Sequence, residues 1–219
     1  MCNLLSYCSY PMAKETNNSR LETFCDGVFA IAITILILEI KIPRITSVTS
    51  VDEFWHEIIR EWPAWFGFAL SFIIILVAWV NHHDIFKLIN KSRPTFVYAN
   101  GLLLFSVVAI PFTTGVMSEF MMTDMAQPAI TVYCAGVLFH CFSWFIFLWT
   151  TMHPVTLIRD DHTAEFVNAT IVAYNRYALF FYFFLCLLSF WQPYVSLVVM
   201  TLSWLIWVVT GIKLNSKKE

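Results

Sequence analysis

Charged residues are scarce in this chain, and their scarcity excludes most soluble folds. Only 13% of the 219 residues are Asp, Glu, Lys or Arg, against about a quarter in an average soluble domain. Apolar residues make up 59% and occur in long runs, and a helix that crosses a membrane needs roughly 20 mostly apolar residues. The runs do not alternate apolar with polar residues as the strands of a membrane β-barrel do. The composition therefore predicts an all-α membrane protein.

Motifs of known enzymes are also missing. The sequence contains no GxSxG, no HExxH, no Walker lysine and no paired carboxylates in an apolar run, so hydrolase chemistry is not indicated. The six cysteines have no CxxC spacing, and we interpret those in apolar runs as small buried hydrophobes. His140, alone in an apolar run, is interpreted as a core residue with satisfied hydrogen bonds. We expect no enzymatic activity, no cofactor, no bound metal and no nucleic-acid partner.

The apolar runs predict six transmembrane helices. They are expected over residues 21–42, 62–89, 96–117, 128–152, 167–191 and 193–213. Residues 1–19 are interpreted as a flexible N-terminal segment without the apolar core of a signal peptide, and residues 214–219 as a short basic tail. With helices that alternate in direction, ten of the thirteen Lys and Arg residues fall on the side of the two termini. This asymmetry predicts that both termini are cytoplasmic.

A segment between the first two spans has the pattern of an amphipathic surface helix. Ser50 and Glu53 have the spacing of a capping box, and apolar residues then recur at helical spacing from Phe54 to Trp62. We predict a short helix that lies on the membrane surface. Its side of the membrane carries seven acidic residues against three basic ones. Such a surface either concentrates cations at the mouth of a pore or is an ordinary solvated rim.

The first span, RLETFCDGVFAIAITILILEI, begins and ends with charged residues. Thr34 is the one polar side chain among the twelve residues between Asp26 and Glu39. Two arrangements of an apolar stripe on this helix are possible. If the stripe faces lipid, Asp26 faces the bundle and pairs there; if the stripe faces a symmetry axis and lines a pore, Asp26 points back into its own subunit. The pattern alone favours contact with lipid or packing in the core over a pore, because an apolar stripe is usually a packing surface. On a helix the stripe consists of Phe24, Gly27, Val28, Ile31, Thr34, Ile35 and Leu38, with Asp26 on roughly the opposite side.

Asp26 requires a partner, since a lone charge at the membrane centre costs about 2.5–3.5 kcal/mol on insertion scales. Arg20 precedes it by six residues. Arg176 is a second candidate, because a fifth span that began after it would be too short to cross the bilayer. His82 and His83 end the apolar part of the second span and are further candidates. Adjacent histidines point about 100° apart on a helix, so a shared metal is not expected.

Two stretches carry a family resemblance. The first span resembles the signature of the transmembrane protein 175 family of potassium channels, an Arg followed after three residues by Phe-Ser-Asp. Arg20, Phe24 and Asp26 stand in register with it, whereas Cys25 stands where the family usually has Ser, a stronger hydrogen-bonding residue. The stretch WVNHHDIF, Trp79–Phe86, is similar to the family's second-helix motif. The chain resembles a prokaryotic member with one six-helix repeat, where animal relatives have two.

The resemblance implies a homotetramer in the prokaryotic plasma membrane, with the first helix of each subunit lining a central pore. It therefore overturns the preference for lipid contact or core packing and assigns the stripe to the pore wall. It implies a constriction at Ile31, with Ile35 and Leu38 farther along, and an influence of Thr34 on ion preference. No TVGYG-like stretch is present, so a modest potassium preference without a carbonyl filter is expected. It also implies that Arg20 and Asp26 pair with His82 or His83 to hold the pore helix. With Phe24 of the motif and Arg176 from the span-length argument, the candidate network comprises Arg20, Phe24, Asp26, His82, His83 and Arg176.

An alternative from another class is a proton-coupled secondary transporter. Acids and histidines in membranes often mark proton paths, and Asp26 with His82 and His83 would form the relay. Carriers built from inverted repeats usually have paired interrupted helices, and the sequence shows no such pair. The favoured interpretation is a passive channel whose partners are further copies of itself, monovalent cations and lipid.

Overall fold

The described part of the chain is built from helices. A computed structural model describes residues 18–40, 49–89, 93–152 and 177–215. Residues Tyr177–Leu188 form a further apolar helical stretch. The elements in chain order are α1 (Ser19–Ile35), the 3-10 helix η1 (Leu36–Glu39), α2 (Val51–Arg60), α3 (Trp62–Leu88), α4 (Pro94–Phe120), α5 (Ala126–Met152) and α7 (Pro193–Asn215).

Four of these helical segments are long and apolar enough to cross a membrane: Ser19–Leu38, Trp62–Lys87, Pro94–Phe120 and Ala126–Thr151. They correspond to the first four predicted spans, so the prediction of an all-α membrane protein with several spans is confirmed. Proline in the first turn of α3 and of α4 suits a helix start, where its missing N–H has no intrahelical partner in any case. The predicted fifth span begins outside the described residues, and Arg176 lies outside them too. The count of six spans therefore stays a prediction.

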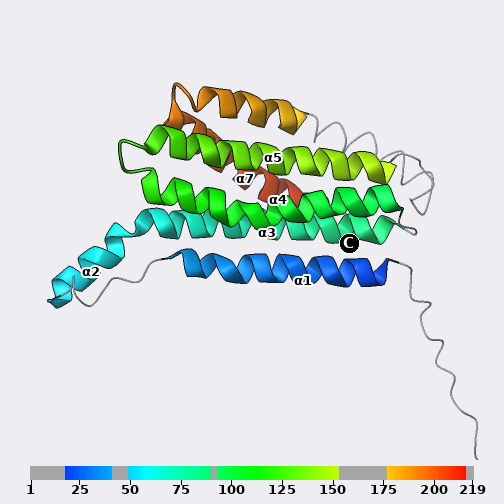
Figure 1. The fold of residues 1–219 in the computed structure, drawn as a ribbon, viewed down its shortest axis with the longest axis horizontal. Helices are drawn as coiled ribbons and strands as arrows, with labels where there is room; N and C mark the ends of the chain where they lie inside the picture. The colour runs from blue at the N-terminus through cyan, green and yellow to red at the C-terminus, as the bar shows by residue number, and fades with distance from the viewer. Residues whose placement is uncertain (1–17, 41–48, 90–92, 153–176, 216–219) are drawn as a thin grey trace, which may run out of the picture.

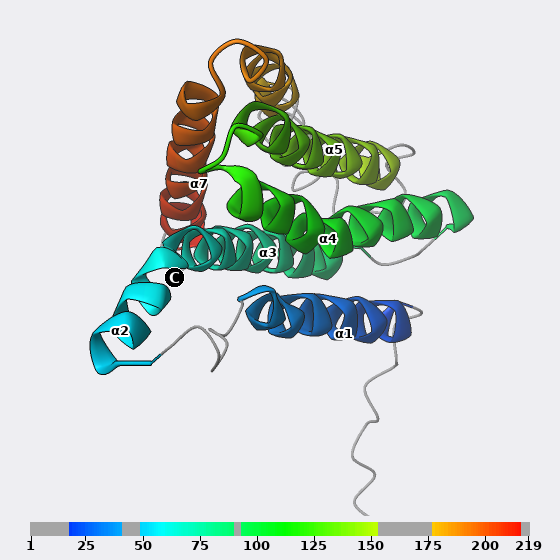
Figure 2. The same cartoon turned by 60° about the vertical axis from the view of Figure 1, so that its left-hand side comes forward.

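The helix α1 lies at one side of the bundle. Figure 1 shows α1, α3, α4 and α5 side by side, and α1 packs against α3 and α4. The turned view in Figure 2 also leaves α1 at the edge, while α7 packs against α3 and α5. One face of α1 is therefore not covered by the described part of the chain.

The helices α4 and α5 approach each other closely at Gly136. A Cβ atom added there would lie 2.7 Å from both Cγ2 and Oγ1 of Thr113. Real Cβ atoms do not approach other heavy atoms this closely, so the contact between the helices depends on glycine.

The helix predicted between the first two spans is present as α2, with its capping box. Ser50 Oγ accepts a hydrogen bond from the backbone N–H of Glu53 at 3.2 Å, and the Glu53 carboxylate accepts one from the Ser50 N–H at 3.2 Å. The Thr49 hydroxyl and N–H also donate to that carboxylate, each at 2.7 Å. These bonds, the one from the Thr49 hydroxyl foremost, lower the pKa of Glu53. The spacing of Ser50 and Glu53 thus predicted the start of this helix correctly.

Candidate functional site

Most of the stripe predicted on the first span lies on the outward face of α1 and η1. Phe24 is 62% exposed, Ile31 59%, Ile35 44% and Leu38 77%. The opposite face is buried against α3 and α4 through Cys25, Phe29, Ala32 and Leu36. Apart from Val28, which is half-buried against the core, the stripe is therefore not packed in the core of the same described bundle. What remains is contact with lipid or with a pore formed by several copies.

Thr34 lies within the exposed stripe and presents an acceptor oxygen. Its hydroxyl donates back into its own helix, to the carbonyl oxygens of Ala30 and Ile31, both at 3.0 Å. A hydroxyl has one hydrogen and two lone pairs, so the oxygen is left with acceptor capacity on an exposed face. An oxygen oriented in this way can act as a partial ligand for a cation.

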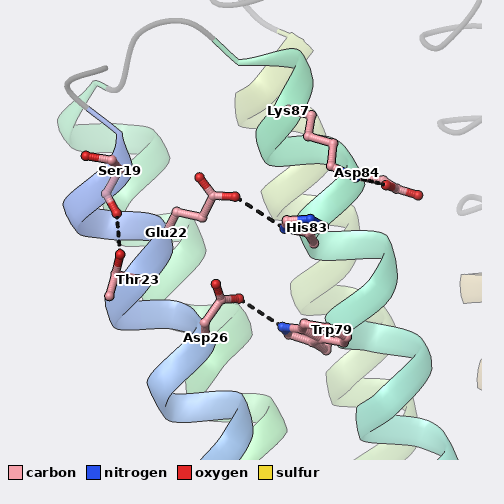
Figure 3. Close-up of polar contacts among 8 residues, drawn as sticks. All are labelled: Ser19, Glu22, Thr23, Asp26, Trp79, His83, Asp84 and Lys87. Carbon is pink, nitrogen blue, oxygen red and sulfur yellow. Dashed lines mark hydrogen bonds and ion pairs between the residues drawn. The ribbon is translucent and has the colours of Figure 1, made fainter. Parts of the chain in front are cut away.

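Two polar contacts join α1 to α3. Trp79 Nε1 donates to Asp26 Oδ1 at 2.9 Å, and His83 Nδ1 lies 3.3 Å from Glu22 Oε1 (Figure 3). The rings of Trp79 and His83 stack with centroids 6.0 Å apart. Glu22 and Asp26 are four residues apart on α1, and Trp79 and His83 are four apart on α3. About one helix turn separates the members of each pair, so they lie on the same face of their helix. The two contacts therefore form successive rungs between antiparallel helices.

These contacts differ from the pairing that the resemblance implied. Among the described residues Asp26 accepts from Trp79 and forms no ion pair with Arg20 or with either histidine. Arg20 and Phe24 lie exposed on α1. The reason is the register of α1 against α3. In this register Trp79 lies opposite Asp26, and His83, one turn farther along α3, lies opposite Glu22 (Figure 3). Sequence reasoning missed Trp79 as a partner, although it lies in the second-helix motif.

His82 belongs to a second, buried cluster. Its Nε2 lies 2.8 Å from Oδ1 of Asn100, whose Nδ2 donates to Sγ of Cys25 at 3.0 Å. Because the amide nitrogen of Asn100 donates to Cys25, its oxygen must accept, and His82 Nε2 carries the hydrogen. The cluster joins α3, α4 and α1, and all three residues are almost fully buried. Sequence reasoning missed Asn100. The signal that could have found it is an amide side chain directly before a long apolar run.

The ring of His82 is surrounded by aromatic side chains. Its centroid lies 4.4 Å from that of Phe86, 5.2 Å from Phe29 and 5.5 Å from Phe147. His83 instead faces Glu22, so the two adjacent histidines point to different surroundings. Within the ranges that the structure describes, no three metal-ligating side chains gather closely enough to hold a metal.

His140 is a core residue with both ring nitrogens bonded, as predicted. Trp144 Nε1 donates to His140 Nε2 at 3.1 Å, so that nitrogen is an acceptor. Nδ1 lies 2.9 Å from Ser106 Oγ, which donates to the carbonyl of Leu103 at 2.7 Å. The hydrogen between His140 and Ser106 must then come from Nδ1. The histidine is neutral and links α4 to α5.

A groove of about 700 Å³ lies between α1 and α4, and residues of the exposed stripe form most of its α1 wall. Glu119, near the end of α4, is the one acidic residue among its lining residues. The groove is mostly apolar and open to the outside of the bundle, so it is shaped to receive an apolar segment or chain. It is lined by Val28, Ile31, Ala32 and Ile35 of α1 and by Val108, Pro111, Phe112, Gly115, Val116, Glu119 and Phe120 of α4.

Comparison with known proteins bears on this arrangement. The family model described as the endosomal/lysosomal potassium channel TMEM175 matches residues 20–111, which include α1, both rungs and the His82 cluster. A potassium channel of Chamaesiphon minutus is 41% identical over 146 residues, which are 67% of this chain and 70% of the relative. The chain belongs to the TMEM175 family. The prediction from the two sequence stretches is thereby confirmed.

Two further comparisons place the chain within the family. The crystal structure of a TMEM175 homologue from Chamaesiphon minutus, described as a lysosomal potassium-selective channel, matches with a TM-score of 0.76 and 34% identity. The match covers 88% of this chain and 96% of that one. A relative from Gallus gallus, named as an endosomal/lysosomal proton channel TMEM175, is 30% identical over 197 residues, 84% of this chain and 38% of the relative. The TMEM175 fold thus extends over most of the chain.

Proposed function

We propose that this chain is a potassium channel whose permeation path is lined by α1. The observation that carries the proposal is the division of α1 into two faces. Asp26 and Cys25 bond inward to α3 and α4, while the apolar stripe with Thr34 is exposed. The Thr34 hydroxyl donates within its own helix and keeps an acceptor oxygen on the exposed face, where a cation can contact it. Membership of a family of potassium channels supports this reading.

A path along α1 requires more than one copy of the chain. A single helix at the edge of a bundle cannot enclose a pore, so we infer a homotetramer in which four α1 helices surround the axis. The groove between α1 and α4 supports this assembly, since its α4 wall, beside the stripe, offers a mostly apolar surface to a neighbouring subunit. Each subunit would contribute six spans and lie in the plasma membrane with both termini in the cytoplasm.

The narrowest part of the path is assigned to a ring of Ile31. Isoleucine rings can close a pore by steric contact and by dewetting. Ile35 and Leu38 continue the same exposed face toward the end of α1 and η1. In Ile31→Asn, each subunit would add an amide to the constriction, which would hydrate it and raise single-channel conductance. Unchanged currents would place the gate elsewhere.

The ion preference is assigned to Thr34. Four hydroxyl oxygens with free lone pairs would replace part of the hydration shell of a cation, more weakly than a cage of carbonyl oxygens. The test is a bilayer recording of the purified protein under a potassium/sodium gradient. Thr34→Ser keeps the acceptor and should keep the reversal potential, whereas Thr34→Ala should move it toward zero. Equal reversal potentials for both variants would refute the role of the hydroxyl.

The geometry does not favour the alternative of a proton-coupled transporter. The partner of Asp26 is an indole N–H, which donates but cannot accept a proton, so Trp79 cannot pass protons onward. His82 bonds to Asn100 rather than to Asp26, which interrupts the expected relay. Flux separates the two classes: discrete single-channel steps support the channel, and slow saturable uptake without steps would support a carrier.

A further inference from the structure

The helix α2 carries a large apolar face that the described bundle leaves uncovered. No residue of α2 is buried, and Val51, Trp55 and Ile59 are among its exposed apolar side chains. At 100° per residue the apolar positions from Val51 to Trp62 fall within an arc of about 140°. Charged and polar residues occupy the rest of the circumference. An exposed apolar patch of this kind marks a contact with a membrane or with another protein.

The position of α2 in the fold narrows the choice of contact. α2 packs against α3 and projects from the end of the bundle in both views (Figures 1 and 2). α3, a span of the membrane, begins at Trp62, directly after the C-cap residue of α2, Glu61. Trp62 and Trp65 are both exposed there, and tryptophan is enriched where a membrane helix crosses the headgroup region. The apolar face of α2 is thus followed directly by the exposed tryptophans at the start of α3.

We propose that α2 is an interfacial anchor, seated in the headgroup region of the leaflet that α3 enters. Phe54, Trp55 and Ile59 reach toward the acyl chains, and the polar face is in water. The occupant of the apolar face is therefore phospholipid, and the anchor begins at a defined point because the capping box fixes the first turn of the helix.

The charge of the polar face predicts which lipid headgroups are needed to hold α2 at the membrane. Interfacial helices attracted by anionic lipid usually carry Lys and Arg on the polar face. Here that face carries Asp52, Glu53 and Glu57 with one basic residue, Arg60, which lies 3.5 Å from Glu57. Attraction to negative headgroups is absent, so burial of the apolar side chains holds the helix. Zwitterionic lipid is enough, and anionic lipid brings no gain.

A photo-crosslinking experiment tests the proposal. The amino acid p-benzoylphenylalanine replaces Trp55 in one variant and Glu57, on the polar face, in a matched control. Ile59 serves as a second apolar position, in case the first variant fails to fold. The full chain is reconstituted in phosphatidylcholine vesicles and irradiated, and adducts are identified by mass spectrometry. Lipid adducts are expected at positions 55 and 59, at least tenfold above position 57.

Each other outcome overturns the proposal. Adducts between two chains at position 55 would assign the apolar face to a second copy. No adducts at either apolar position would place that face in water, and equal adducts at 55 and 57 would contradict the orientation of α2. A yield that rises several-fold when phosphatidylglycerol is added would show that headgroup charge, rather than apolar burial, holds the helix.

Discussion

Replacement of Asn100 by leucine should destabilise the protein by about 1–3 kcal/mol. Asn100 accepts from His82 at 2.8 Å and donates to Cys25 at 3.0 Å. Leucine has a similar volume but no acceptor, and His82 is fully buried. Its other ring nitrogen, Nδ1, already has no hydrogen-bond partner, so either tautomer would leave one N–H unsatisfied. A buried donor without a partner costs about 1–3 kcal/mol, and the weaker bond to sulfur adds little.

A second substitution should restore most of that loss. Replacing both partners of a buried hydrogen bond by apolar groups of similar shape can be nearly neutral. The ring of His82 is already surrounded by Phe29, Phe86 and Phe147, so phenylalanine fits the chemistry of the site. The double variant His82→Phe with Asn100→Leu should therefore be more stable than Asn100→Leu alone.

Thermal unfolding of the purified protein in detergent, followed by size-exclusion chromatography of heated samples, gives the comparison. The single variant should melt several degrees below the natural chain, and the double variant should recover at least half of the difference. A single variant as stable as the natural chain would show that the amide is not needed there. A double variant less stable than the single would refute the reasoning from the unpaired N–H.

Two further predictions concern packing and pH. Gly136→Ala should lower the melting temperature, because the new methyl would lie 2.7 Å from Thr113 and overpacking costs about 1–3 kcal/mol; Gly101→Ala, with open space around it, should not, and equal effects would contradict the close contact of α4 with α5. The pKa of Glu53 is lowered in the fold by its bonds from Thr49, so its contribution to α2 is present at neutral pH and is lost as the pH falls through the ordinary glutamate range to the lowered value. Corrected for intrinsic rates, hydrogen exchange of α2 amides should speed up on acidification in the natural chain and much less in Glu53→Gln.

Patterns within one helix were enough to predict much of this fold. The spacing of Ser50 and Glu53 predicted the capping box of α2, and the periodicity of the first span predicted which side chains of α1 share a face. Both patterns arise from local geometry, in which residues three or four apart lie on the same face. The apolar runs predicted the first four spans for a similar reason, since their length and composition are properties of one segment.

Contacts between helices were harder to predict. Sequence alone indicated that Asp26 needs a partner, yet the candidates that it offered were arginines and histidines, and Trp79 was not among them. The partner depends on the vertical register of α1 against α3, and no pattern in either helix specifies that register. Asn100 was missed for the same reason, since its role is visible only once α4 brings it between Cys25 and His82.

The polar anchors of α1 are concentrated in its first half, and this distribution separates stability from conduction. Glu22, Cys25 and Asp26 make the polar contacts from α1 to α3 and α4. Beyond them, in the described residues, α1 is held by apolar packing, and the hydroxyl of Thr34 bonds only within its own helix. Ile31 is mostly exposed, so its substitution removes few contacts within one subunit. Substitutions at Ile31 or Thr34 should therefore change conductance or ion preference with little effect on melting temperature, whereas changes at the anchors should alter both. A large loss of stability in Thr34→Ser would contradict this division.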